Sequence, residues 1–320
     1  MNGIEVGICL PNSLDNLTTL AHTCEELGFD SVWNVDGVMD EFIERTYDLK
    51  VCLSALANAT NRIKIGSCVM ATCRESPFNI ARFFAALDRY SKGRVIAGLG
   101  AGVASQAIPF GVPHISDMLE RFKELLKVTK SLFLQEKVNF KGTYFTLNSA
   151  SLESESLQKP HPPFWLGTNL DRAIRETAEF ADGWLPGVTA PEIYGMELNT
   201  FIESIESAGR NPKAIVPACF EMINVSKSKK ESLDRVGRLL APIGLWWNRS
   251  QKIGYKKYHS AKEVPNEVVE KLSILGSASD CAQRIGEFAD AGVKHIILYP
   301  LPIKSIPKML TEIAELTKTI

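Results

Sequence analysis

The sequence predicts an α/β protein in which eight parallel strands close into a (β/α)8 TIM barrel with insertions. Strand-like and helix-like patterns alternate along all 320 residues. The strands are near-continuous apolar runs, as expected when both faces of a strand are covered. Two of them stop at small residues just before a helical pattern, at Gly100-Ala101-Gly102 and at Gly167-Thr168. Small residues at the carboxyl end of a parallel strand let a ligand approach the backbone closely.

The predicted strands and helices follow one another in a regular order. The strands cover residues 4–10, 29–35, 63–70, 95–100, 164–167, 183–186, 214–225 and 295–299. The helices cover residues 14–27, 42–59, 78–90, 115–134, 171–180, 191–208, 231–240, 280–291 and 306–318. Gly28 is a typical helix stop, and Pro77 suits a first helical turn. A doubly wound sheet is the alternative, but it would carry glycines after the first strand, and this chain has none there.

Two segments interrupt this alternation. Residues 138–147 alternate apolar and polar side chains around a turn at Lys141-Gly142, which predicts a β-hairpin within an insertion near residues 138–158. Residues 242–265 lack a clear period, as is typical of a loop or lid beside a site. We therefore expect one barrel domain over residues 1–320, since barrels of this length usually form one domain.

The composition bears on partners and compartment. The formal net charge is −1, which indicates no general attraction to nucleic acid or to a membrane surface. No signal peptide and no apolar run long enough for a membrane span is visible. The seven cysteines are an odd number without zinc-like spacing, as in reduced cytosolic proteins. We expect a cytoplasmic protein without a metal site.

Residues just after the strands form the active site of a barrel enzyme. Here they are poor in acid–base groups, and they contain neither a Ser/His/Asp set nor a metal cluster. Such a site suits a coenzyme that performs the reaction while the protein orients it. In chain order these positions are 9–12, 34–36, 68–70, 100–102, 167–169, 186–187, 221 and 299–300.

Three carboxylates are candidate catalytic groups. Asp36, just past an apolar strand, is the strongest, although a helix cap or a turn is its plainer interpretation. Glu221 lies inside a long strand, where it faces either the barrel interior or the outside; the two are equally favoured. Glu75, beside Arg74 after the third strand, is a possible substrate-facing charge.

Five segments together resemble the bacterial luciferase-like superfamily, although no single one is specific. This superfamily of (β/α)8 barrels includes flavin-dependent monooxygenases and deazaflavin (coenzyme F420)-dependent reductases and dehydrogenases. The segments occur in the right order over nearly the whole chain. They are residues 21–33 with Glu-Leu-Gly-Phe-Asp-Ser-Val-Trp, 62–69, 87–102 with Leu-Asp-Arg-Tyr-Ser-Lys-Gly-Arg, 159–187 with Ala-Asp-Gly-Trp, and 276–300 with Ala-Asp-Ala-Gly.

The resemblance implies where the coenzyme lies. A bulge after the third strand, with a non-proline cis peptide between Cys68 and Val69, supports the ring system. Asp36 contacts the ring, the glycine loop after the fourth strand lines the ring or ribityl chain, and backbone N–H groups after the fifth strand hold the phosphate. The implied cofactor-binding residues are Asp36, Cys68, Val69, Met70, Gly100, Ala101, Gly102, Gly167, Thr168, Asn169 and Gly187.

Three positions depart from the family's known enzymes. Family dehydrogenases that oxidise a sugar phosphate carry His directly after the Asp and Glu after the glycines, where this chain has Gly37 and Val103. That activity is therefore not expected. The methylene-tetrahydromethanopterin reductases carry a carboxylate on the first strand, where this chain has Cys9.

The resemblance implies an oxidoreductase that transfers a hydride between coenzyme F420 and a small or pterin-like substrate, similar in architecture to methylene-tetrahydromethanopterin reductase. One alternative is an FMN-dependent luciferase-like monooxygenase, which would need a flavin reductase as partner. A second alternative is a non-catalytic flavin-binding protein, because fold does not fix function. The family commonly forms dimers, so we expect a homodimer that binds neither nucleic acid nor membranes.

Overall fold

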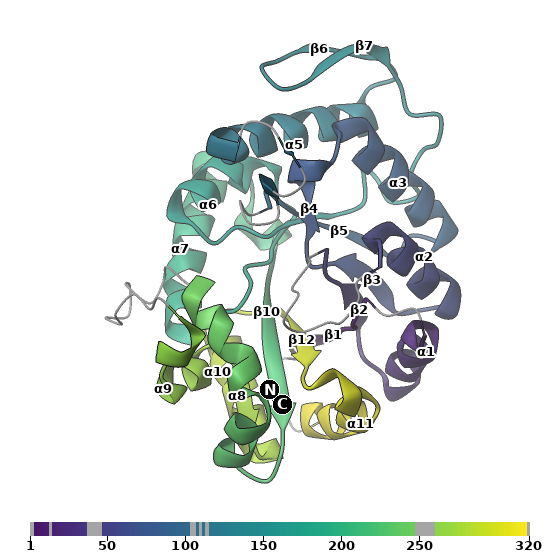
Figure 1. Cartoon of the computed structure of the whole chain (residues 1–320). Coiled ribbons are helices and arrows are strands. Elements are labelled where there is room, and N and C mark those ends of the chain that lie inside the picture. Colours follow the sequence, from purple (N-terminus) through teal and green to yellow (C-terminus); the bar gives the residue numbers. More distant parts are fainter. Residues whose placement is uncertain are drawn as a thin grey trace.

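The barrel predicted from the sequence is confirmed by the computed structural model, which describes residues 3–12, 15–36, 47–102, 107–108, 111–112, 115–246 and 260–318 (Figure 1). Over these residues eight parallel strands form a closed ring, because the last strand pairs with the first. In order around the barrel they are β1 (Glu5–Cys9), β2 (Ser31–Asn34), β3 (Lys64–Ser67), β5 (Val95–Gly100), β8 (Phe164–Leu166), β9 (Gly183–Trp184), β10 (Val216–Val225) and β12 (His295–Pro300).

Helices cover the outside of this ring (Figure 1). α1 ends at Gly28, which adopts the left-handed conformation with φ of 86°, as its place in the sequence predicts. α3 begins at Pro77 after Ser76, whose hydroxyl accepts a hydrogen bond from the Asn79 N–H. The described helices are α1 (Leu17–Leu27), α2 (Leu49–Ala59), α3 (Pro77–Tyr90), α5 (Met118–Leu134), α6 (Asp171–Thr177), α7 (Pro191–Ser207), α8 (Lys229–Trp246), α9 (Asn266–Lys271), α10 (Ala278–Asp290) and α11 (Ile306–Thr317).

Two apolar layers hold the barrel together. The outer face of each strand packs on the helices, while the inner faces fill the interior. The rings of Trp33 and Trp165 lie inside with their centroids 5.3 Å apart. Gly66 and Gly183 make room for them, since a Cβ at either position would collide with the indole of Trp33 or Trp165, respectively. Because side chains fill the middle of the barrel, space for a ligand is expected at the carboxyl ends of the strands.

The irregular segments follow the sequence in part. The predicted hairpin is present as β6 (Val138–Lys141) and β7 (Thr146–Ala150). Residues 242–246, expected to be irregular, continue α8, while residues 247–259 lie outside the described ranges. An unexpected short strand, β11 (Ile274–Gly276), pairs with the carboxyl end of β10. None of the described helices combines the length and apolarity needed to cross a bilayer.

Candidate active site

A break in the third strand shapes the carboxyl edge of the barrel. The peptide bond between Cys68 and Val69 is cis, as the resemblance implies. β3 ends at Ser67, and pairing with β5 resumes after the cis bond as β4 (Met70–Ala71), where Met70 lies opposite Leu99. The Cys68 N–H still donates to the Asn34 carbonyl at 2.9 Å. The chain therefore bulges between two paired stretches, at the position predicted to support a coenzyme ring.

Two glycines hold the side chain of Val69 in place. A Cβ at Gly100 would lie 2.6 Å from Val69 Cγ2, and a Cβ at Gly167 would lie 2.9 Å from Val69 Cγ1. Real Cβ atoms do not approach other atoms so closely, so both positions need glycine to seat this bulge. We call Val69 with Gly100 and Gly167 the bulge cradle. The sequence identified these glycines as ligand-approach sites, and the structure adds that they accommodate Val69.

The loop after β5 is tight for a similar reason. Ala101 and Gly102 are half-buried, and Gly102 has φ of 87°. A Cβ there would lie 2.6 Å from Cys73 Sγ. The loop is also tied to the bulge, because the Thr72 hydroxyl donates to the Gly100 carbonyl at 2.9 Å.

Asp36 joins the end of β2 to the bulge. One carboxylate oxygen accepts the Ala71 N–H at 2.9 Å, and the other pairs with the Arg74 guanidinium at 2.8 Å. Both side chains of this ion pair are mostly but not fully buried. Asp36 therefore lies beside the bulge, as the resemblance implies, and both of its oxygens already have partners within the chain.

Glu75 is also ion-paired at this edge. Its carboxylate accepts from Lys50 Nζ of α2 at 2.6 Å. The Arg121 guanidinium of α5 donates to the carbonyls of Thr72 and Glu75, each at 2.9 Å. Two cations thus hold the short turn after β4, Lys50 at its carboxylate and Arg121 at its backbone.

At the edge formed by β8 and β9, the two backbone N–H groups that the resemblance assigns to the phosphate form hydrogen bonds within the chain. The Gly167 N–H donates to the Leu99 carbonyl at 2.9 Å, and the Thr168 N–H donates to the Leu166 carbonyl at 3.1 Å. The Asn169 side-chain amide exchanges two longer contacts with the Gly187 backbone, at 3.3 and 3.4 Å. The buried Thr168 hydroxyl, by contrast, has no hydrogen-bond partner in the described part of the chain.

Glu221 does not face the barrel interior. On β10 its neighbours Phe220 and Met222 belong to the inner apolar cluster, whereas Cys219 belongs to the helix-facing cluster, so the alternation places Glu221 on the helix side. Its carboxylate accepts the Thr189 N–H at 2.7 Å. Burial raises the pKa of the Cys219 thiol, and the adjacent Glu221 carboxylate raises it further. We therefore correct the assignment of Glu221 as a catalytic residue.

The floor beneath the bulge combines two cysteines named from the sequence with a tyrosine, Tyr299, to which sequence reasoning gave no role. Cys9 and Cys68 lie with their sulfur atoms 3.5 Å apart. Tyr299 of β12 also faces this inner cluster, and its buried hydroxyl has no hydrogen-bond partner among the described residues. Burial raises the pKa of Tyr299, and the neighbouring Cys9 and Cys68 raise it further. The alternation of side chains along the last strand, which places Tyr299 on the inner face, was the signal that could have identified it.

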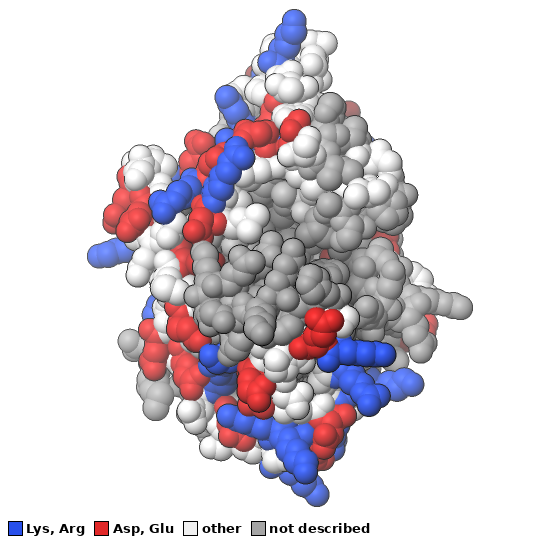
Figure 2. All heavy atoms as spheres, turned by 60° about the vertical axis from the view of Figure 1, so that its left-hand side comes forward, with Lys and Arg blue, Asp and Glu red and all other residues white. Residues whose placement is uncertain are grey.

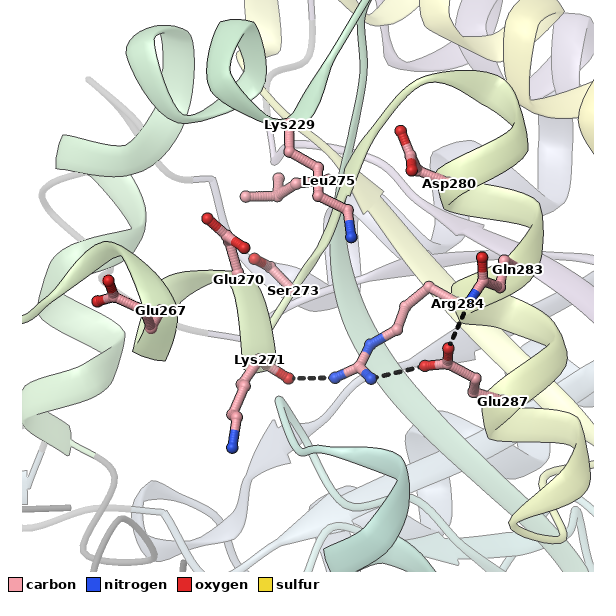
Figure 3. Close-up of a pocket in the computed structure, with 10 residues that line it drawn as sticks. All are labelled: Lys229, Glu267, Glu270, Lys271, Ser273, Leu275, Asp280, Gln283, Arg284 and Glu287. Carbon is pink, nitrogen blue, oxygen red and sulfur yellow. Dashed lines mark hydrogen bonds and ion pairs between the residues drawn. The ribbon is translucent and has the colours of Figure 1, made fainter.

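A cavity of about 600 Å³ lies at the end of β10, where Val225 and Ser226 line it together with side chains of α10 and α11. A cavity of about 270 Å³ lies between α8, α9 and α10 (Figure 3). Arg284 crosses it, donating to the Lys271 carbonyl and to Glu287. Charged helix side chains, rather than strand ends, dominate this lining. On the face in Figure 2, acidic and basic side chains are interspersed, consistent with the net charge of −1.

The family model of the luciferase-like monooxygenases matches residues 3–295, and the chain belongs to this family. It is 26% identical over 299 residues to an F420-dependent glucose-6-phosphate dehydrogenase of Microbacterium testaceum, covering 90% of this chain and 87% of that protein.

Solved structures share the fold. An F420-dependent secondary alcohol dehydrogenase, in complex with an F420-acetone adduct, superposes with a TM-score of 0.85 at 21% identity and 98% coverage of both chains. The coenzyme F420-dependent tetrahydromethanopterin reductase from Methanopyrus kandleri superposes with a TM-score of 0.82 at 19% identity, again with 98% coverage of both chains.

Proposed function

We propose that this protein is an oxidoreductase that transfers a hydride between coenzyme F420 and a small or pterin-like substrate. The observation that carries the proposal is the bulge after β3, where Val69 lies between Gly100 and Gly167 at the carboxyl edge of the barrel. The F420 dependence of the similar dehydrogenase and of both structural neighbours, as their names state, supports this coenzyme.

The residues at this edge fit such a coenzyme. Buried polar atoms without a partner among the described residues, at Thr168 and Tyr299, are the kind of groups that a bound ligand satisfies. When bound, the deazaflavin ring accepts or donates the hydride. The residues that would hold it are Asp36, Cys68, Val69, Met70, Gly100, Ala101, Gly102, Gly167, Thr168, Asn169 and Gly187.

The protein's own groups position and shield the reaction. The bulge would support the coenzyme ring, and the apolar inner cluster beneath the bulge would exclude water from that side. Asp36 and Glu75 remain the proposed catalytic carboxylates, and their ion pairs with Arg74 and Lys50 hold each carboxylate in place at this edge. Gly37 and Val103, whose structure lies outside the described residues, replace the His and Glu of sugar-phosphate oxidation, which argues for another substrate.

The assembly and compartment form part of the proposal. We infer a single barrel domain over residues 1–320 that forms a homodimer in the cytoplasm. Exposed apolar side chains on α2 and α3, namely Val51, Phe78 and Tyr90, support association through this side of the barrel. All seven cysteines are buried and free, which supports a reducing compartment.

The first test is equilibrium binding of F420 and of FMN to the purified protein, followed by coenzyme fluorescence. We expect F420 to bind at least about tenfold more tightly, which corresponds to about 1.4 kcal/mol. Tighter binding of FMN would overturn the proposal in favour of the monooxygenase, and oxygen consumption with a flavin reductase would then be measured. If F420 binds but its absorbance does not change when a secondary alcohol or a reduced pterin is added, the result would favour a carrier protein.

A matched pair of variants locates the site. Thr168→Val removes a buried hydroxyl without a partner in the described structure, so we expect weaker F420 binding with little loss of stability. Thr129→Val is the control, since Thr129 is buried in α5 and its hydroxyl bonds to the Leu125 carbonyl. Equal F420 affinity in both variants would contradict the assignment of Thr168.

A further inference from the structure

Two thiols meet directly under the bulge cradle. Cys9 is the last residue of β1, and Cys68 follows β3 and precedes the cis bond. Their sulfur atoms lie 3.5 Å apart, and the Cys68 thiol donates toward Cys9. All seven cysteines lie in described parts of the chain, and this is the one pair there that is joined by a hydrogen bond.

We propose that Cys9 and Cys68 are a modification site, at which a reversible disulfide disables the coenzyme cradle. This inference rests on the proposed function for its consequence, although the bond itself can be tested without it. A disulfide has an S–S distance of about 2.05 Å, so the two sulfur atoms must approach by roughly 1.5 Å. β1 and β3 are separated by β2, so the backbone of the bulge, rather than a paired strand, supplies the movement.

The packing links this movement to the cradle. Val69, the next residue after Cys68, fits between Gly100 and Gly167 with no space to spare. Drawing Cys68 toward β1 therefore pulls Val69 away from both glycines. The Cys68 N–H and thiol also contact the Asn34 carbonyl, at 2.9 and 3.6 Å, and both contacts must readjust. The surface that supports the coenzyme ring consequently changes shape.

Hydrogen peroxide, or another peroxide, is the oxidant class that the proposal requires. The Cys68 thiolate attacks one peroxide oxygen and releases hydroxide, which leaves a sulfenic acid on Cys68. The Cys9 sulfur then attacks the Cys68 sulfur, the S–S bond forms and water leaves. In total, two thiols and one peroxide give one disulfide and two waters. Reduction by an external dithiol reverses the reaction.

The order of attack follows from exposure. Cys68 is 9% exposed, whereas Cys9 is fully buried. Burial raises the pKa of Cys68, and the neighbouring Cys9 raises it further; Tyr299 also faces this pair. The thiolate is therefore scarce at neutral pH, and we expect oxidation to be slow, over hours in excess peroxide.

The test combines mass spectrometry with coenzyme binding. The protein is treated with hydrogen peroxide, its remaining thiols are blocked with N-ethylmaleimide under denaturing conditions, and peptides are analysed with and without dithiothreitol. We expect a linked peptide pair containing Cys9 and Cys68, lost on reduction, together with at least about a tenfold weaker affinity for F420 that reduction restores.

Two variants make the test specific. In Cys9→Ala the disulfide cannot form and oxidation of Cys68 stops short of the linked peptide, so peroxide should weaken F420 binding less than it does in the natural protein. The control variant is Cys281→Ala, because Cys281 is a buried cysteine of α10. In this variant peroxide should still link Cys9 to Cys68 and weaken F420 binding, as in the natural protein. Alkylation of both Cys9 and Cys68 after full peroxide treatment would overturn the proposal.

The remaining outcomes separate the two levels of inference. A Cys9–Cys68 bond with unchanged F420 affinity would overturn the coupling to the cradle. If the reduced protein binds neither F420 nor FMN, the proposed function fails, while the linked peptide still decides whether the modification site exists.

Discussion

A methyl group at Gly100 would test whether the bulge cradle is built as tightly as the structure shows. In Gly100→Ala the new Cβ would lie 2.6 Å from Val69 Cγ2, whereas ordinary carbon contacts begin near about 3.5 Å. Val69 must therefore move by roughly 1 Å, or the loop after β5 must yield. Overpacking of this size lowers the free energy of unfolding by about 1–3 kcal/mol.

The variant Val69→Ala provides the rescue. Alone it removes two methyl groups of a half-buried side chain, which should lower the free energy of unfolding by about 1 kcal/mol. In the double variant the atom that obstructs the new methyl group is gone. We therefore expect the double variant to cost less than the sum of the single variants, with a coupling free energy of about 1–3 kcal/mol.

Urea unfolding, followed by tryptophan fluorescence, measures these free energies, and F420 binding measures the cradle. Gly286→Ala is the control, because a Cβ there meets open space within α10, and alanine should stabilise the helix by about 0.5–1 kcal/mol. Unchanged stability of Gly100→Ala, or strict additivity with Val69→Ala, would refute the packing argument.

Three further predictions concern side chains that hold turns and strand ends in place. Arg94→Lys should lower the free energy of unfolding in urea by about 2–3 kcal/mol. The Arg94 guanidinium donates to five backbone or hydroxyl oxygens, and a lysine ammonium cannot reach them all. A loss below about 0.5 kcal/mol would contradict this. Glu124→Ala should speed amide exchange at residues 143–145, whose three N–H groups its carboxylate accepts, and unchanged exchange would count against that role. The pKa of Glu5 is lowered to about 2, first by its hydrogen bond with His295 and, against the effect of burial, also by Lys64. A lowered folded-state pKa contributes stability that is present above about pH 4.5 and is lost as the pH falls toward 2. Between these pH values the free energy of unfolding of Glu5→Gln should therefore fall less than that of the natural protein, by roughly 1 kcal/mol after discounting for the exposure of Glu5. Parallel curves of unfolding free energy against pH would refute this.

The sequence predicted the eight barrel strands because a strand covered on both faces must be apolar along its whole length. That signal is local, and so are the helix stop at Gly28 and the helix start at Pro77. β11 was missed because its three residues form a strand only through pairing with β10, and a pairing partner is not visible in a local pattern.

For the candidate site, the sequence proposed the positions and the tertiary structure decided their geometry. The glycines at 100 and 167 were identified because glycine lacks a Cβ, but only the folded barrel brings Val69 against both of them. The alternation of side chains along a strand defines two faces but does not say which one lies inside the barrel. That Glu221 faces the helices was therefore decided only by closure of the barrel. Cys9 and Cys68 are 59 residues apart in the chain, and only the packing of β1 and the bulge at one end of the barrel brings their sulfur atoms together.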